Sequence, residues 1–395
     1  MEEWKSYKLG DISTIQTGPF GSQLHQSDYV ERGVPCIMPT NIGRMLDFQV
    51  AGIAHISEGD ALKLSRHIVH EGDIVYSRRG DIEKCAYVSQ EQDGWFCGTG
   101  CLKIRINSNL AVPKFVAYYL STDEIKSWIV GNAVGTTMLN LNTSVLADVP
   151  LSLPSIQMQK RCVQILDSIE NKIALNNRIN HNLEEQIQYR FDCMIMSENG
   201  LGYCQIADYV DVNPKRSLGK NVFAKCIDMS FLSTTGPFPS GWETKGYNGG
   251  MKFLNGDTIM ARITPCLENG KVAFVNFLED GEVAFGSTEY IVLHAKDGVA
   301  PVFTYFLARN KDFVDYATKN MNGSSGRQRV SGDTIEKYKI PVIDSDSLNE
   351  FSRFAAPAME VIRNNSFENR SLASTRDALL PLLLSGNLSI TQMNC

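Results

Sequence analysis

Two segments of the chain carry apolar residues at alternating intervals of three and four. In the first segment, which begins at Ile156 and reaches about Phe191, the repeated positions are Cys162, Leu166, Ile169, Ile173, Leu183 and Ile187. In the second they are Leu348, Ala355, Ala358, Ile362, Leu372, Leu379 and Leu383. This spacing is typical of helices that pair along a coiled-coil seam, so the pattern predicts two long helices. A helix of ~30 residues is roughly 45 Å long, which is a length suited to a spacer.

Asparagines interrupt each apolar stripe near its middle. They are Asn176 and Asn180 in the first helix, and Asn365 and Asn369 in the second. If a two-fold axis crosses the helix pair, the helices run antiparallel, carry the flanking domains to opposite ends, and bring the four asparagines together. A buried polar layer weakens a coiled coil but fixes its register. The alternative, that the seam is loose and the asparagines are simply exposed, stays open at this point.

The rest of the chain has the pattern of short strands mixed with short helices. Segments rich in β-branched and aromatic residues, bounded by Gly, Asp and Asn, lie at 73–77, 101–106, 258–262, 272–277 and 289–293. Helical patterns lie between them at 114–120, 124–130, 302–307 and 313–317. Each half of the chain therefore has the pattern of a mixed α+β domain.

The two halves also repeat one another in sequence. Residues 72–78, GDIVYSR, return as residues 256–262, GDTIMAR. Further matches follow in the same order, pairing residues 112–120 with 300–307, 135–138 with 326–329, and 148–150 with 339–341, and residues 7–12 are faintly similar to 204–209. A duplication of about half the chain predicts two similar domains with equivalent sites.

These patterns together predict an α+β fold with two tandem, structurally similar domains, separated by two long antiparallel coiled-coil helices in a pseudo-two-fold arrangement. The predicted boundaries are 1–154 for the first domain, 155–197 for the first helix, 198–344 for the second domain, and 345–395 for the second helix and the C-terminal tail.

Composition points to a globular protein and to no membrane or metal site. The chain has 395 residues, of which 43% are hydrophobic and 21% charged, and its apolar runs are too short to span a bilayer. The first residues are too acidic for a secretory signal, so we expect a cytoplasmic protein. Ten cysteines at irregular spacing, with only Cys97 and Cys101 close together, favour reduced, buried thiols over a zinc site.

The charge of the chain gives conflicting evidence on whether it binds nucleic acid. A formal net charge of -6 counts against nucleic-acid binding. Local basic clusters nevertheless occur at Arg78-Arg79 with Lys84, at Lys215-Arg216 with Lys220 and Lys225, and at Arg327-Gln328-Arg329. One such cluster is more often a solvated face, but two clusters at equivalent positions of a repeat favour a shared function.

The sequence lacks the familiar motifs of a catalytic subunit. Gly270-Lys271 is followed by Val272, so it does not form a phosphate-binding loop, and Gly98-Thr99-Gly100 does not extend to a dinucleotide fingerprint. Asn213-Pro214-Lys215 stops short of the Asn-Pro-Pro-Tyr type of methyltransferase motif. We therefore expect a chain that is not an enzyme, with no cofactor bound to it.

At this point the residues resemble a known family, the specificity subunits of type I restriction-modification systems. The opening of a recognition domain is similar to residues 17–24, TGPFGSQL, and its close is similar to residues 135–141, GTTMLNL, with 149–154, VPLSLP, and Gln159. The second copy keeps 326–331 and Ile340-Pro341, but its start at 211–215, DVNPK, lacks the Gly-Pro-Phe-Gly turn. The resemblance covers almost the whole chain.

The resemblance implies a reader of double-stranded DNA. Each domain would read one half of a bipartite, asymmetric site, and the helices would bind two methyltransferase subunits. Motor-nuclease subunits would join the assembled complex. S-adenosylmethionine, ATP and magnesium would be bound by those partners.

Candidate DNA contacts follow from side-chain chemistry. Arg pairs bidentately with guanine, Gln and Asn pair with adenine, and hydroxyls on Gly-containing loops approach phosphates. In the first domain the candidates are Gln23, Arg78, Arg79, Thr136, Thr137 and Asn140. In the second they are Arg262, Lys271, Arg327, Gln328 and Arg329. For any one of them a structural role is equally open, since Arg262 could simply pair with Glu289.

A second function class also fits the pattern. The two domains could bind proteins, with the coiled coil acting only as a spacer in a scaffold that never touches DNA. The net acidity of the chain favours this alternative slightly.

Overall fold

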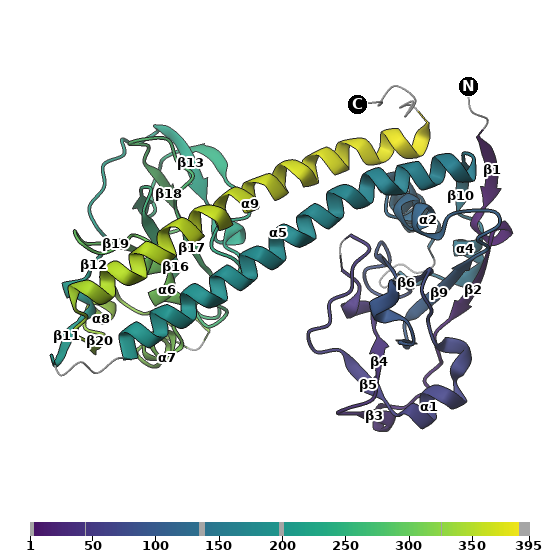
Figure 1. Cartoon of the computed structure of the whole chain (residues 1–395), viewed down its shortest axis with the longest axis horizontal. Helices are drawn as coiled ribbons and strands as arrows, with labels where there is room; N and C mark the ends of the chain where they lie inside the picture. The colour runs from purple at the N-terminus through teal and green to yellow at the C-terminus, as the bar shows by residue number, and fades with distance from the viewer. Residues whose placement is uncertain (1–3, 44, 134–138, 197–200, 325, 387–395) are drawn as a thin grey trace. The chain divides into compact units, whose positions relative to one another are not determined.

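The computed structural model describes residues 4–43, 45–133, 139–196, 201–324 and 326–386. The chain divides into two compact units, one of Met1–Asn171 with Leu372–Cys395 and the other of Lys172–Ser371. Two 41-residue helices, α5 (Ile156–Met196) and α9 (Ser345–Ser385), each contribute to both units (Figure 1). Among the described residues, no helix is both long enough and apolar enough to cross a membrane.

The first unit contains two four-stranded sheets. One of them is an antiparallel sheet with the strand order β2 (Ser13–Thr17), β9 (Cys101–Ile106), β6 (Asp73–Ser77) and β7 (Cys85–Tyr87). The second sheet has the order β3 (Tyr29–Val30), β5 (Ala54–Ile56), β4 (Val34–Ile37) and β8 (Phe96–Cys97), and β1 (Lys5–Lys8) pairs with β10 (Pro150–Leu153). The helices of this unit are α1 (Glu58–Lys63), α2 (Pro113–Leu120), α3 (Asp123–Asn132) and α4 (Thr143–Ala147).

The second unit repeats this arrangement. Its antiparallel sheet has the order β12 (Val210–Val212), β19 (Tyr290–Ala295), β16 (Asp257–Ala261) and β17 (Val272–Phe274). The other sheet is β14 (Glu243–Gly246), β13 (Phe223–Ile227), β18 (Ala284–Gly286) and β15 (Lys252–Phe253), and β11 (Tyr203–Gln205) pairs with β20 (Lys339–Pro341). The helices are α6 (Phe303–Arg309), α7 (Lys311–Lys319) and α8 (Gly332–Glu336), and α6 packs on β16, β17 and β19.

The predicted fold class, with two similar α+β domains and two long helices, is confirmed. The register of the repeat needs one correction. Leu141 donates its backbone N–H to the Arg78 carbonyl, as Val330 does to the Arg262 carbonyl, at 3.0 Å in both cases. Asn140 is therefore the counterpart of Arg329, and the sequence pairing of 135–138 with 326–329, which placed Met138 there, was wrong by two residues. That pairing had been based on aligning Gly135 with Gly326, in a loop that has no hydrophobic periodicity to fix the register. Residues 134–138 themselves lie outside the described part of the chain.

The helix pair is antiparallel within each unit. In the first unit, Cys162 and Leu166 of α5 share a core with Leu383 of α9, and Glu170 accepts from Arg376 at 2.8 Å. In the second unit, Ile187 and Phe191 share a core with Phe351, Ala355 and Ile362. As residue numbers increase along α5, the numbers of the residues that they contact on α9 decrease, as expected for antiparallel helices. Apolar burial along this seam is the main reason that the spaced Leu, Ile and Ala residues form helices here.

A polar layer interrupts the seam within the second unit. Asn176 is 1% exposed, and its Nδ2 donates to Glu368 Oε2 at 2.8 Å and to Asn369 Oδ1 at 2.9 Å. Asn365 Nδ2 donates to Asn180 Oδ1 at 2.9 Å, and Asn369 Nδ2 donates to Asn177 Oδ1 at 2.8 Å. The bond from Asn176, together with Lys172, lowers the pKa of Glu368. A shift of either helix would leave these amides unpaired, so the layer favours this register.

Candidate nucleic-acid interface

The candidate residues of the first domain that the structure describes gather at one edge of its antiparallel sheet. β2 and β6 end at this edge, and β7 and β9 begin there, because neighbouring strands run in opposite directions. Ser77 donates its backbone N–H to the carbonyl of Lys84, and Arg78 donates to the carbonyl of Gly100. Arg78 and Lys84 are thus placed together, although Lys84 pairs with Asp81 at 3.0 Å.

Arg78 lies beside an exposed aromatic ring. Its guanidinium carbon is 5.7 Å from the centroid of Phe20, a side chain that is 54% exposed. The buried Nε atom of Arg78 has no hydrogen-bond partner among the described residues. Sequence reasoning chose the Gly-Pro-Phe-Gly turn for its glycines and missed Phe20. An aromatic residue between two glycines in a polar loop was the signal that could have identified it.

The turn after β2 depends on Gly18. A Cβ atom at this position would lie 2.1 Å from the carbonyl oxygen of Gly98, so only glycine fits between these two backbone segments. Gln23 closes the turn, since its Oε1 accepts from the Phe20 amide at 3.4 Å and from Arg66 Nη2 at 3.3 Å. Gln23 therefore has a local structural role in addition to any contact with a ligand.

The other candidates of the first domain fall into two groups. Arg79 and Asn140 face each other as an isolated antiparallel bridge, and the buried Oδ1 of Asn140 has no partner within the described ranges. This bridge places Asn140 at the same edge as Arg78. Thr136 and Thr137 lie outside the described residues.

The second domain presents an equivalent edge with different side chains. Arg262 follows β16 as Arg78 follows β6, and its buried Nε atom also has no partner in the described part of the chain. Lys271 occupies the position of Lys84, because Ala261 donates to its carbonyl as Ser77 does to that of Lys84. The Lys271 ammonium donates to the Met229 carbonyl at 2.9 Å.

Glu289 interacts with Arg329 rather than forming the Arg262 pair considered above. Arg329 Nη2 lies 2.8 Å from Glu289 Oε1, and Arg329 Nε lies 2.9 Å from Oε2. The hydrogen bonds from Arg329 lower the pKa of the Glu289 carboxyl. Arg262 donates its backbone N–H to the Glu289 carbonyl at 3.0 Å, and the positive charge of its guanidinium also lowers the pKa of the Glu289 carboxyl.

Arg327 and Gln328 lie on the loop that Arg329 closes. Arg329 and Asn322 form a two-residue antiparallel bridge, and Arg329 Nη1 donates to the Arg327 carbonyl at 2.9 Å. The Arg327 side chain is exposed, and Gln328 accepts through its carbonyl from the Thr264 N–H. The structure thus brings Arg262, Lys271, Arg327, Gln328 and Arg329 to one edge.

Comparison with known proteins places this arrangement in a family. Residues 1–185 match the family model described as the type I restriction modification DNA specificity domain. The HindI specificity subunit of Haemophilus influenzae, a type I restriction enzyme subunit, is 20% identical over 468 residues, which cover 98% of this chain and 100% of that protein. Residues 1–185 thus belong to the type I restriction modification DNA specificity domain family, and the whole chain is similar to specificity subunits of type I restriction enzymes.

Two further type I restriction-modification specificity subunits are similar over nearly the whole chain. The MjaIX specificity subunit of Methanocaldococcus jannaschii is 20% identical over 438 residues, covering 99% of this chain and 95% of that one. The crystal structure of the type I restriction-modification S subunit from M. genitalium has a TM-score of 0.62 at 13% identity, and the match covers 97% of this chain and 96% of that one. This structural likeness supports the same fold.

The chain also has a second, exposed stripe on α5 beside the seam, in which apolar residues are mixed with Asn182 and Gln186. Within the second unit, Leu175, Ile179, Asn182, Gln186, Tyr189, Cys193 and Met196 alternate at intervals of four and three, and all seven are exposed. Tyr189 is 70% exposed and Met196 is 69% exposed. Sequence analysis assigned only the inner seam and missed this stripe, because both stripes have the same period on one helix.

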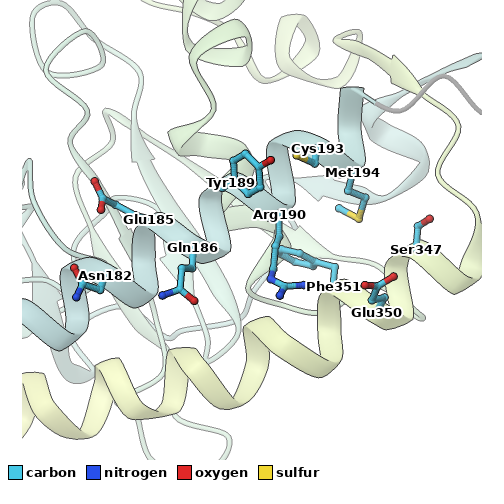
Figure 2. Close-up of a pocket in the computed structure, with 10 residues that line it drawn as sticks. All are labelled: Asn182, Glu185, Gln186, Tyr189, Arg190, Cys193, Met194, Ser347, Glu350 and Phe351. Carbon is cyan, nitrogen blue, oxygen red and sulfur yellow. The ribbon is translucent and has the colours of Figure 1, made fainter.

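A groove of about 750 Å³ lies along part of this stripe. Figure 2 shows Tyr189 and Cys193 on successive turns of α5, with Ser347, Glu350 and Phe351 on α9. Arg190 forms one wall, with its guanidinium 4.2 Å from the ring centroid of Phe354. The second unit therefore offers a groove that combines the apolar side chains of Tyr189, Met194 and Phe351 with polar and charged groups, and such mixed surfaces are common at protein-binding sites.

Proposed function

We propose that this chain recognises a bipartite DNA site, each domain reading one half. The observation that carries the proposal is the equivalence of Arg78 and Arg262, which occupy matching sheet edges and each have a buried Nε without a partner in the described chain. An arginine with uncommitted donors is suited to bidentate pairing with guanine in the major groove. Two such edges on one chain suit a site with two halves.

The two halves of the site should differ in sequence. Around the shared arginine, the first domain has Asn140 where the second has Arg329, and Gly100 where the second has Glu289. Amide and guanidinium groups favour different base edges, and a carboxylate changes the charge beside the shared arginine. The overall charge of -6 does not oppose this function, because basic side chains concentrated at two edges provide local attraction to phosphates.

We further propose that α5 and α9 bind two methyltransferase subunits. The exposed stripe from Leu175 to Met196 supports this assignment, since its alternating spacing suits packing against helices of a partner. In the assembled complex, motor-nuclease subunits would join, and the partners would bind S-adenosylmethionine, ATP and magnesium. In this role the chain is non-catalytic, binds none of these cofactors and acts on DNA in the cytoplasm.

Salt dependence tests the DNA-binding proposal directly. We expect the full chain, co-purified with its methyltransferase, to bind random-sequence duplex with an affinity that falls steeply as salt rises, because bound phosphates release counterions. Because each arginine is proposed to pair with a base, replacing both Arg78→Gln and Arg262→Gln should weaken binding to the selected site by about 1–3 kcal/mol for each lost pairing and relax the base preference in both halves. Fluorescence anisotropy over a salt series, with random duplex and with the selected site, would measure both quantities.

Lys311→Gln provides a matched control, since Lys311 is an exposed cation at the start of α7. This variant should keep both the original salt slope and the original base preference. Binding that is absent, or that does not respond to salt, would contradict the DNA-reading function and favour a protein scaffold held together by the helix surface.

A further inference from the structure

A carboxylate that forms an ion pair with Arg329 lies in the basic edge of the second recognition domain. Glu289 directly precedes β19, beside Arg262 and Arg329. The first domain has Gly100 at this position, since Arg78 and Arg262 donate their backbone N–H groups to the carbonyls of Gly100 and Glu289 respectively. At this position the second domain thus has a carboxylate and the first has none.

Glu289 accepts hydrogen bonds from two of the three nitrogen atoms of the Arg329 guanidinium. The Arg329 guanidinium uses Nε and Nη2 on the carboxylate, and Nη1 on the Arg327 carbonyl. The Arg329 and Glu289 side chains are 39% and 26% exposed, so the pair is accessible to solvent. Such an ion pair contributes little to folding stability. Its larger effect is electrostatic, because it offsets the positive charge of Arg329, whereas the buried Nε of Arg262 has no hydrogen-bond partner among the described residues.

A carboxylate near DNA repels every phosphate alike, whatever the sequence. It therefore weakens the sequence-independent part of binding, while a base contact made by a neighbouring arginine is preserved. Selectivity is a difference between two affinities, so lowering the non-specific one raises it.

We propose that Glu289 is a specificity-determining residue of the second recognition domain. By neutralising Arg329 and holding it at the base of the 322–329 loop, Glu289 suppresses non-specific attraction to phosphate and leaves Arg262 as the cation that reads a base. This inference rests on the proposed DNA-reading function.

Three variants of the full chain, co-purified with the methyltransferase, test this role. Glu289→Gln removes the carboxylate charge, and Glu289→Gln with Arg329→Gln removes both charges of the pair. Asp297→Asn is the matched control, since it makes the same change in net charge at an exposed position just beyond the opposite end of β19. Each protein is titrated with random-sequence duplex over a salt series and is used to select sites from a randomised duplex pool.

Glu289→Gln should bind random duplex more tightly than the parent, and its salt slope should steepen by about 0.9, the value for one additional phosphate. Base preference in the half-site of the second domain should fall about five- to tenfold, within the range of discrimination by one bidentate base pairing, while the other half-site keeps its preference. The double variant should return to the parental slope without regaining the preference. Asp297→Asn should match the parent in both measurements.

A purely structural role would lower affinity and leave the salt slope no steeper, and that outcome would overturn the assignment. Equal behaviour of Glu289→Gln and Asp297→Asn would overturn it as well. If the parental protein itself selects no sequence, the proposed function fails and this inference fails with it. If the parent selects a two-part site and Glu289→Gln selects the same site with the same preference, only the role of Glu289 is refuted.

Discussion

Exchanging the first recognition domain, residues 1–154, for that of another specificity subunit is expected to change one half of the methylated DNA site completely and to leave the other half unaltered. Each domain has its own sheets and its own basic edge, and no described candidate residue of one edge comes from the other domain. Single-base mapping of methylation in cells that carry the chimera and its methyltransferase would measure the result. A change in both halves together would contradict reading by separate domains.

The chimera must keep the contacts that tie the first domain to α5. Gln159 Oε1 accepts from the Val112 N–H at 2.8 Å, and Asp167 accepts from the Tyr118 hydroxyl and the Lys114 ammonium, both at 2.8 Å. A donor domain with the same three groups provides the test. A second chimera that lacks them serves as a control for folding, and it should lose assembly rather than acquire a new site.

The variant Phe191→Ala is expected to destabilise the second unit by about 3–5 kcal/mol, the usual cost of removing a buried aromatic ring. Phe191 of α5 is 0% exposed, and it packs edge-on against Phe303 at 5.0 Å and Phe351 at 5.7 Å between ring centroids. The ring thus joins α5, α6 and α9 in one core. Denaturant unfolding of the full chain would report the loss as a lower midpoint.

Tyr189→Ala is the matched control, two residues away on the same helix. Because Tyr189 is 70% exposed, its loss should change the free energy of unfolding by no more than about 0.5 kcal/mol. The same variant should nevertheless reduce co-purification of the methyltransferase, since the ring lies in the exposed stripe. A stable Phe191→Ala protein would refute the shared core, and undiminished methyltransferase binding by Tyr189→Ala would remove this ring from the docking surface.

The long helices and the paired domains could be predicted from the sequence because their signals are periodic. The spacing of Leu166, Ile169 and Ile173 is that of an amphipathic helix. The repeat of GDIVYSR as GDTIMAR places two strands in equivalent positions. The same repeat located Arg78 and Arg262 at matching strand ends. Periodicity and repetition are properties of the chain itself, so no tertiary contact was needed to recognise them.

The pairing of side chains within the candidate site could not be predicted in this way. Glu289 and Arg329 are 40 residues apart, and the strand hydrogen bonds that bring them together fix a register that loops of unequal length conceal. Phe20 owes its importance to its position beside Arg78, and that position follows from the close approach of Gly18 to Gly98. Such relationships depend on which backbone segments meet, and the local sequence does not encode them.

The most direct test of DNA reading by this chain is a single-base map of adenine and cytosine methylation in cells that express it with its methyltransferase, compared with cells in which only this chain has been deleted. The expected result is a methylated motif that is present only with the chain and consists of two different specific parts separated by several unread base pairs. A methylation pattern that does not change when the chain is deleted, or a motif that is continuous and symmetric, would contradict the proposal that two recognition domains read two half-sites.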